Sequence, residues 1–197
     1  MSGTLALLVG DSPAVWEDLG FAVDDGVAWT AGVAHVLGGE QKGIRAWSVA
    51  DIDGIPYVEP PSLSGAKTGE DHPNGVTSLD HVVLATPDLE RTIGALERAG
   101  YELRRRRDAG QTYERPLQQA FFRVGPTILE VIGTPGQQGD GVPRFFGLAF
   151  TVADLDATAA FLGDRLHPAK EAVQPGRRIA TLDRAAGSTV AVAFMSS

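Results

Sequence analysis

One pattern occurs twice in the chain, at a constant spacing of 66 residues. Residues 79–92 read LDHVVLATPDLERT, and residues 145–158 read FFGLAFTVADLDAT. Each copy opens with a short apolar run, continues with an Asp-Leu pair and has threonine at its last position. A repeat of this kind predicts one structural unit used more than once. If the unit contains a sheet with one apolar face, it must pack against another copy to bury that face.

The first copy predicts a strand that leads into a helix. Residues 79–85 form a short apolar run with adjacent valines, which is typical of a strand. Thr86 and Pro87 then resemble an N-cap and a proline at the first helical position. Asp88 and Glu90 would lie in the first turn, where acidic side chains are favoured.

The helix is followed by further strands, which defines the whole unit. Leu89, Ile93 and Leu96 recur at helical spacing and make one apolar face, and Gly100 ends the helix. Three strand-like runs follow at 101–107, 119–124 and 127–132. The unit is therefore expected to be βαβββ. The same order is expected after the second copy, with a strand at 146–152, a helix at 154–162 and strands near Lys170, Ile179 and Val190.

Two segments rich in proline and glycine divide the chain into three blocks. Residues 56–76 and 134–143 have no apolar periodicity and are interpreted as linkers. They separate a degenerate N-terminal βαβββ-like module, 1–55, from the modules 77–133 and 144–197. In the first module, Ser12-Pro13 predicts the start of a helix, and the run GIRAWSV (43–49) is interpreted as the counterpart of TILEVI (127–132).

Composition excludes several classes of protein. The 197 residues include no cysteine, which excludes disulfides, thiolate zinc sites and cysteine nucleophiles. A net charge of −8 argues against binding to nucleic acid. The N-terminus lacks the features of a signal peptide, and no apolar run reaches the roughly 20 residues of a membrane span. We therefore expect a cytoplasmic protein with no membrane partner. There is also no phosphate-binding loop and no G-x-S-x-G motif.

The tandem unit, with HVVLATPDLERTIGALERAGYEL followed by QQAFFRVGPTILEVIG, resembles the vicinal oxygen chelate superfamily. That superfamily includes glyoxalase I, bleomycin-resistance proteins, extradiol dioxygenases and methylmalonyl-CoA epimerase. The resemblance covers residues 78–195 and implies an α+β fold in which tandem βαβββ modules form a cupped mixed sheet around a cavity. It places metal ligands on the first and last strands of a module, which here are His81 and Glu130. Imidazole and carboxylate suit Fe, Mn, Ni, Zn or Co.

The last block departs from this pattern. The spacing of 66 places Gly147 opposite His81, and alignment of VAVAF with ILEVI places Val192 opposite Glu130. Neither residue can bind a metal. One function is therefore a metal-assisted lyase, isomerase or epimerase, or a dioxygenase-like enzyme, that acts next to a carbonyl. The alternative is a metal-free protein of the bleomycin-resistance type that binds or sequesters a small molecule.

His81 and Glu130 each have a second interpretation. His81 is expected on a strand face with Leu79 and Val83, where a histidine is often only a buried, hydrogen-bonded residue. Glu130, between Ile128 and Ile132 on one face, could be a metal ligand, a member of a salt bridge, or a catalytic base with a raised pKa. Exposure to water at the edge of the sheet is the remaining interpretation.

Gln119, Phe121 and Arg123 share one face of their strand and are predicted to contact the ligand. The alternative places the aromatic residues in the core and the polar ones at the surface. The run 104–107, four consecutive arginines, would alternate between the two faces and serve as a solvated edge strand. Finally, modules two and three are expected to pair within one chain. The alternative is a homodimer that brings two copies of the His81–Glu130 pair to one symmetric site.

Overall fold

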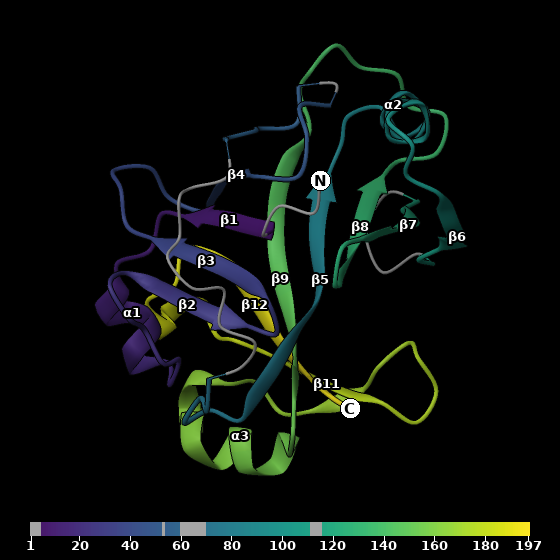
Figure 1. The fold of residues 1–197 in the computed structure, drawn as a ribbon. Helices are drawn as coiled ribbons and strands as arrows, with labels where there is room; N and C mark the ends of the chain where they lie inside the picture. Colours follow the sequence, from purple (N-terminus) through teal and green to yellow (C-terminus); the bar gives the residue numbers. More distant parts are fainter. Residues whose placement is uncertain (1–4, 53, 60–69, 111–115) are drawn as a thin grey trace.

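Two sheets make up the fold in the computed structural model, which describes residues 5–52, 54–59, 70–110 and 116–197. The smaller sheet has the strand order β2-β3-β1-β4, and the larger has the order β10-β11-β12-β9-β5-β8-β7-β6 (Figure 1). The N-terminal elements are β1 (Leu5–Val9), α1 (Pro13–Asp18), β2 (Val27–Thr30), β3 (Val33–Leu37) and β4 (Ile44–Trp47). The others are β5 (Val76–Ala85), α2 (Leu89–Arg98), β6 (Leu103–Asp108), β7 (Gln118–Val124), β8 (Thr127–Gly133), β9 (Arg144–Val152), α3 (Leu155–Leu162), β10 (Lys170–Glu171), β11 (Arg178–Thr181) and β12 (Ala191–Ser196), with short 3-10 turns at Gly163–Arg165 and Arg184–Ala186.

The larger sheet confirms the predicted α+β fold of paired βαβββ units. In each unit the first strand is parallel to the last, β5 to β8 and β9 to β12. The two first strands, β5 and β9, pair antiparallel in the centre. Val82 pairs with Leu148, which is 66 residues away, and His81 and Val83 pair with Ala149 and Gly147 on either side. The sequence repeat is thus also a structural one, related by an approximate twofold axis through the Val82–Leu148 pair.

This pairing occurs within one chain, as expected. Both edges of β5 are occupied, by β8 on one side and β9 on the other. A second copy of the chain therefore cannot pair with β5 to form the symmetric site of the homodimer alternative.

Helix α2 begins two residues later than the interpretation of Thr86-Pro87 predicted. Asp88, not Thr86, is the N-cap of α2, and its side chain accepts a hydrogen bond from the Arg91 amide. The Thr86 hydroxyl instead accepts from the Asp88 amide and bonds the hydroxyl of buried Thr92. Asp154 caps α3 in the same manner. In the N-terminal module, Ser12 and Pro13 start α1 as predicted.

One face of the larger sheet is covered by the helices and by the smaller sheet. Phe150 of β9 is fully buried there, with its ring centroid 5.0 Å from Phe21, 5.4 Å from His35 and 6.1 Å from Trp16. Figure 1 shows the N-terminal elements beside β9 and β5, with α2 and α3 at opposite ends of the molecule. We call this the covered face.

The N-terminal sheet is not a complete copy of the repeat. Its strand β3 is the parallel neighbour of β1, whereas β4 is antiparallel to β1. The interpretation of residues 43–49 as the counterpart of 127–132 is therefore wrong. Only one strand, β2, lies between α1 and β3, whereas β6 and β7 lie between α2 and β8, so the parallel position is filled one strand earlier.

Candidate functional site

The sheet registers bring the predicted site residues onto the face opposite to the covered one, which we call the open face. One row across the strands contains Phe121, Glu130, Val83, Gly147 and Ala191. The next row contains Arg123, Ile128, His81, Ala149 and Ala193. Residues in register on neighbouring strands point to the same side of a sheet. His81 and Glu130 therefore lie diagonally on adjacent strands.

A bulge in β5 brings a further residue into this group. The pairing of β5 with β9 shifts between Leu79 and His81, so that Asp80 is the extra residue. A bulge re-aims side chains at the point of insertion. Leu79 consequently lies in the core with Val82 and Leu84. The prediction that Leu79 shares a strand face with His81 is therefore wrong. Asp80 and His81, although adjacent in sequence, contact each other through their side chains.

His81 lies between two carboxylates. Its Nε2 is 3.3 Å from Oε2 of Glu130, and its Nδ1 is 2.8 Å from Oδ1 of Asp80. The side chains of His81 and Glu130 are 18% and 9% exposed, so the pair is largely shielded but still reached by solvent. The structure therefore brings together the two residues predicted as metal ligands.

Each carboxylate has its own fixed partner. Arg177, in the loop before β11, donates to Oδ2 of Asp80 at 2.8 Å, and Thr151 also bonds this oxygen. Gln119 of β7 donates to Oε1 of Glu130 at 2.5 Å, and Arg107 of β6 in turn donates to Oε1 of Gln119 at 2.7 Å. A continuous polar chain thus crosses the open face from Arg177 to Arg107.

These contacts set the charge of Asp80. Burial alone would raise the pKa of this carboxyl, but hydrogen bonds and charge from His81 and Arg177 outweigh it and lower the pKa to about 2. Asp80 is therefore a carboxylate at neutral pH and accepts from Nδ1–H of His81. When Nδ1 carries the ring proton, Nε2 of His81 is an acceptor, as is Oε2 of an ionised Glu130. A hydrogen bond between these two atoms therefore needs one further proton.

The donor set fits part of a metal site. Two donor atoms bound to one divalent ion at about 2.0–2.2 Å are about 3 Å apart in neighbouring coordination positions, close to the separation of Nε2 and Oε2. The carboxylate on Nδ1 is also the partner that metal-bound histidines usually have. However, the described residues contain no group of three or more His, Cys, Asp or Glu side chains arranged to hold a metal. His81 and Glu130 would leave the remaining positions to water or substrate.

The second half of the sheet lacks equivalent donors. Gly147 occupies the position related to His81, as predicted. The position related to Glu130 is Ala193, because Ala149 pairs with Ala193 as Val83 pairs with Glu130. The prediction of Val192 is wrong by one residue, since Val192 is buried on the covered face. The connection between the last two strands differs in the two halves: it spans 125–126 in the first and 182–190 in the second.

Of the predicted ligand residues, Gln119 bonds Glu130, and Phe121 lies directly opposite Glu130. Arg123 lies farther along β7, in register with Ile128. The residues of β7 that point to the opposite face from Phe121 are buried: Ala120, Phe122 and Val124. The predicted alternation of faces along this strand is therefore confirmed. Sequence reasoning missed Asp80, Arg107 and Arg177. Asp80 could have been noticed as the neighbour of His81, but no sequence signal connects it to Arg177.

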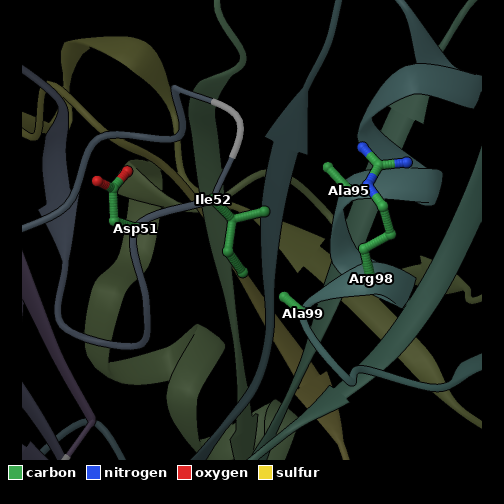
Figure 2. A pocket seen from close by; sticks show the side chains of 5 residues that line it. All are labelled: Asp51, Ile52, Ala95, Arg98 and Ala99. Carbon is green, nitrogen blue, oxygen red and sulfur yellow. The ribbon is translucent and has the colours of Figure 1, made fainter.

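Two surface hollows accompany these groups. One, of about 280 Å³, lies on β6–β8 and is lined by Arg104, Phe121, Phe122, Arg123 and Ile128. The other, of about 310 Å³, lies between the segment at Asp51 and Ile52 and the helix α2, lined there by Ala95, Arg98 and Ala99 (Figure 2). Figure 2 shows the carboxylate of Asp51 pointing away from Arg98, so these two charges do not converge on one point. Two residues of the first hollow, Phe121 and Ile128, are in register with Glu130 and His81 on the neighbouring strands.

No family model and no curated protein matches the sequence. Among solved structures, a variant of methylmalonyl-CoA epimerase from Streptomyces coelicolor in complex with 2-nitronate-propionyl-CoA aligns with a TM-score of 0.50 and 21% identity over 62% of this chain and 98% of that one. Methylmalonyl-CoA epimerase in complex with methylmalonyl-CoA and NH4+ gives 0.50 and 21%, over 62% and 95%. The epimerase from Mycobacterium tuberculosis gives 0.49 and 22%, over 62% and 89%.

These likenesses show the fold. Over about 62% of its length, the chain has the paired βαβββ fold of these structures, as the sequence predicted. Methylmalonyl-CoA epimerases are among its structural neighbours. Within the part of the chain that the structure describes, no helix is both long enough and apolar enough to span a membrane.

Proposed function

We propose that this protein is an enzyme that binds a small carbonyl compound on the open face and moves a proton at the carbon next to the carbonyl. The observation that supports this most directly is the 3.3 Å contact between Nε2 of His81 and Oε2 of Glu130, with each side chain fixed from behind by Asp80 or Gln119. A fixed acid–base pair of this kind suits general acid–base catalysis. The reaction class would be an epimerase, isomerase or lyase.

A proton held between Nε2 and Oε2 would give the two residues complementary roles. In one form Glu130 is a carboxylate and can accept a proton from carbon, while His81 is an imidazolium that can donate to the carbonyl oxygen as negative charge develops there. Asp80 keeps Nδ1 protonated and stabilises the imidazolium, as the third member of a catalytic triad does. Gln119 holds one oxygen of Glu130 and leaves Oε2 directed at His81.

Space for a ligand is present beside the pair. On the same two rows, the second half of the sheet presents Gly147, Ala149, Ala191 and Ala193, and a bulge adds the exposed Phe146 next to Gly147. The residues of β9 and β12 on the row of His81 are therefore both alanines. The hollow of about 280 Å³ at Phe121 and Ile128 adds room on the other side.

A divalent cation is the second candidate, because Asp80 orients Nε2 of His81 as a metal ligand would require. His81 and Glu130 would hold the ion, which we expect to be Fe, Mn, Ni, Zn or Co. When bound, it would act as a Lewis acid on the carbonyl oxygen.

The test measures exchange of the proton next to a carbonyl for deuterium by NMR, with methylmalonyl-CoA as the first probe, with and without each metal. We expect exchange by the wild type and a loss of about a hundredfold or more in His81→Ala and Glu130→Gln. His167→Ala and Glu171→Gln remove the same groups from exposed positions and serve as controls. A thermal shift with a metal that disappears in His81→Ala would identify the cation.

The alternative function, sequestration of a small molecule without chemistry, predicts a different result. The wild type would then show no exchange with any carbonyl probe or metal, and His81→Ala would bind the ligand as tightly as the wild type. That outcome would contradict the proposed enzymatic function and support sequestration of a small molecule.

A further inference from the structure

A second bulge turns the arginine run into part of the open face. The pairing of β6 with β7 shifts between Leu103 and Arg105, so that Arg104 and Arg105 both lie opposite Phe121. The alternation expected for residues 104–107 is therefore interrupted. Only Arg106 turns to the covered face, where it pairs with Glu90 of α2. Arg107 lies over the ring of Phe121, with its guanidinium carbon 5.6 Å from the centroid.

The result is a concentration of positive charge around one aromatic ring in a chain of net charge −8. Arg104 and Arg123 line the hollow together with Phe121 and Ile128. Within the described residues, Arg123 donates from its Nε alone, to the Gly125 carbonyl. Among the residues that the structure describes, Arg105 has no hydrogen-bond or ion-pair partner.

One carboxylate partly offsets this charge. Glu102 pairs with Arg104 at 2.7 Å, but the two side chains are 75% and 59% exposed. Exposed pairs of this kind contribute little free energy, so a ligand can replace Glu102 as the partner of Arg104. Glu130 is already held by Gln119 and His81. The guanidinium groups of Arg105 and Arg123 therefore remain available to an anion.

We propose that this hollow, the arginine hollow, binds the anionic end of a small organic acid whose flat apolar part lies against Phe121. Guanidinium groups pair with carboxylate or phosphate through two parallel hydrogen bonds, and the aromatic ring contacts the rest of the molecule. This inference rests on the proposed function for the position of the reacting carbon.

The registers then limit the size of the substrate. Phe121 is the direct partner of Glu130 on the neighbouring strand, and Arg105 is the partner of Phe121 on the next one. Strands are about 4.8 Å apart, so the anionic group lies about 5–10 Å from the carbon at Glu130. The inferred substrate class is a carbonyl compound with a carboxylate or phosphate a few bonds away.

The experiment titrates matched pairs of probes into the protein and follows the backbone amides of Phe121, Arg123 and Ile128 by NMR. The pairs are benzoate with benzyl alcohol and phenyl phosphate with phenol. We expect the anions to shift these amides and the neutral partners not to do so, and the stronger of the two anions identifies the preferred group. Arg104→Gln and Arg123→Gln each change an arginine that lines the hollow and should each weaken binding about tenfold.

Two further variants separate the possible explanations. Arg184→Gln makes the same change of charge in the other half of the chain and should leave binding unchanged. Equal weakening by all three arginine variants, or equal binding of the neutral probes, would overturn the inference. Anion binding does not require the acid–base pair, so His81→Ala should retain it. Anion binding by a wild type that catalyses no proton exchange would therefore support the hollow while contradicting the proposed function.

Discussion

The two halves of the larger sheet have the same strand order but very different open faces. On the two rows defined above, the half formed by β5–β8 presents His81, Glu130 and Phe121, whereas the strands of the other half present Gly147, Ala149, Ala191 and Ala193. Their covered faces are alike, because both are filled by large apolar side chains such as Phe122 and Phe150. Packing thus constrains the covered face in both halves, while the open face is free to differ.

This difference explains how one repeat can serve two purposes. A paired sheet needs both units to bury its covered face, so neither unit can be lost. Only one unit needs to supply reactive groups. The other unit contributes small side chains beside the reactive pair. It also contributes Arg177, which forms an ion pair with Asp80. The candidate site therefore depends on both halves although its reactive pair comes from one.

The largest effect is expected when one buried phenylalanine ring is removed from each half of the larger sheet. Phe122→Ala and Phe150→Ala each remove a fully buried side chain and should lower the free energy of unfolding by about 3–5 kcal/mol. Phe150 should be the more costly position, because it also contacts Trp16, Phe21 and His35 of the N-terminal module. Urea unfolding would measure both. Equal losses would show that docking of the N-terminal module does not depend on Phe150.

The next prediction concerns the N-terminal module and the dependence of the free energy of unfolding on pH. Burial, with a smaller contribution from His72, lowers the pKa of His35 from 6.5 to about 3. Burial also lowers the pKa of His72, which Trp29, Glu70 and Asp71 partly oppose. Both rings must therefore stay neutral in the fold. Nδ1 of His72 accepts from the Ala22 amide, which a protonated ring could not do.

The sign of the effect follows from these lowered values. The unfolded chain binds a proton at His35 below about pH 6.5 and the folded chain does not, so stability falls as pH falls from 6.5 toward 3. We expect a loss of about 2 kcal/mol between pH 6.5 and 5 from this group. His35→Gln should make the free energy of unfolding less dependent on pH in this range. The exposed variant His167→Gln is the control, and an equal change in both would contradict the assignment.

The sequence alone was sufficient for the architecture of the larger sheet. A spacing of 66 residues, together with apolar runs of strand and helix period, predicted both βαβββ units and their pairing within one chain. The resemblance to the vicinal oxygen chelate superfamily indicated His81 and Glu130, and strand alternation added Gln119; the fold brings these three residues into contact. Periodicity was sufficient for the architecture because it reports which side of an element is buried.

What the sequence could not reveal depends on bulges and on distant contacts. The bulges at Asp80 and Arg104 each insert one residue, which reverses the faces expected on one side of the insertion. Leu79 and the arginine run were misplaced for this reason. Arg177 is 97 residues from Asp80, and nothing in its local pattern indicates the contact. The parallel role of β3 likewise became clear only from the pairing of strands.

The smallest effect tests whether the two units remain equivalent at their helices. Asp88 caps α2 through one amide, that of Arg91, whereas Asp154 caps α3 through the amides of Asp156 and Ala157. Replacing either aspartate by alanine should cost about 1 kcal/mol, with Asp154→Ala the more costly because two donors lose their acceptor. Asparagine keeps an accepting oxygen, so Asp88→Asn and Asp154→Asn should recover most of the loss. Thermal unfolding of the four variants would measure this, and a greater loss at Asp88 would show that the Thr86 hydroxyl, which also accepts from the Asp88 amide, depends on the cap.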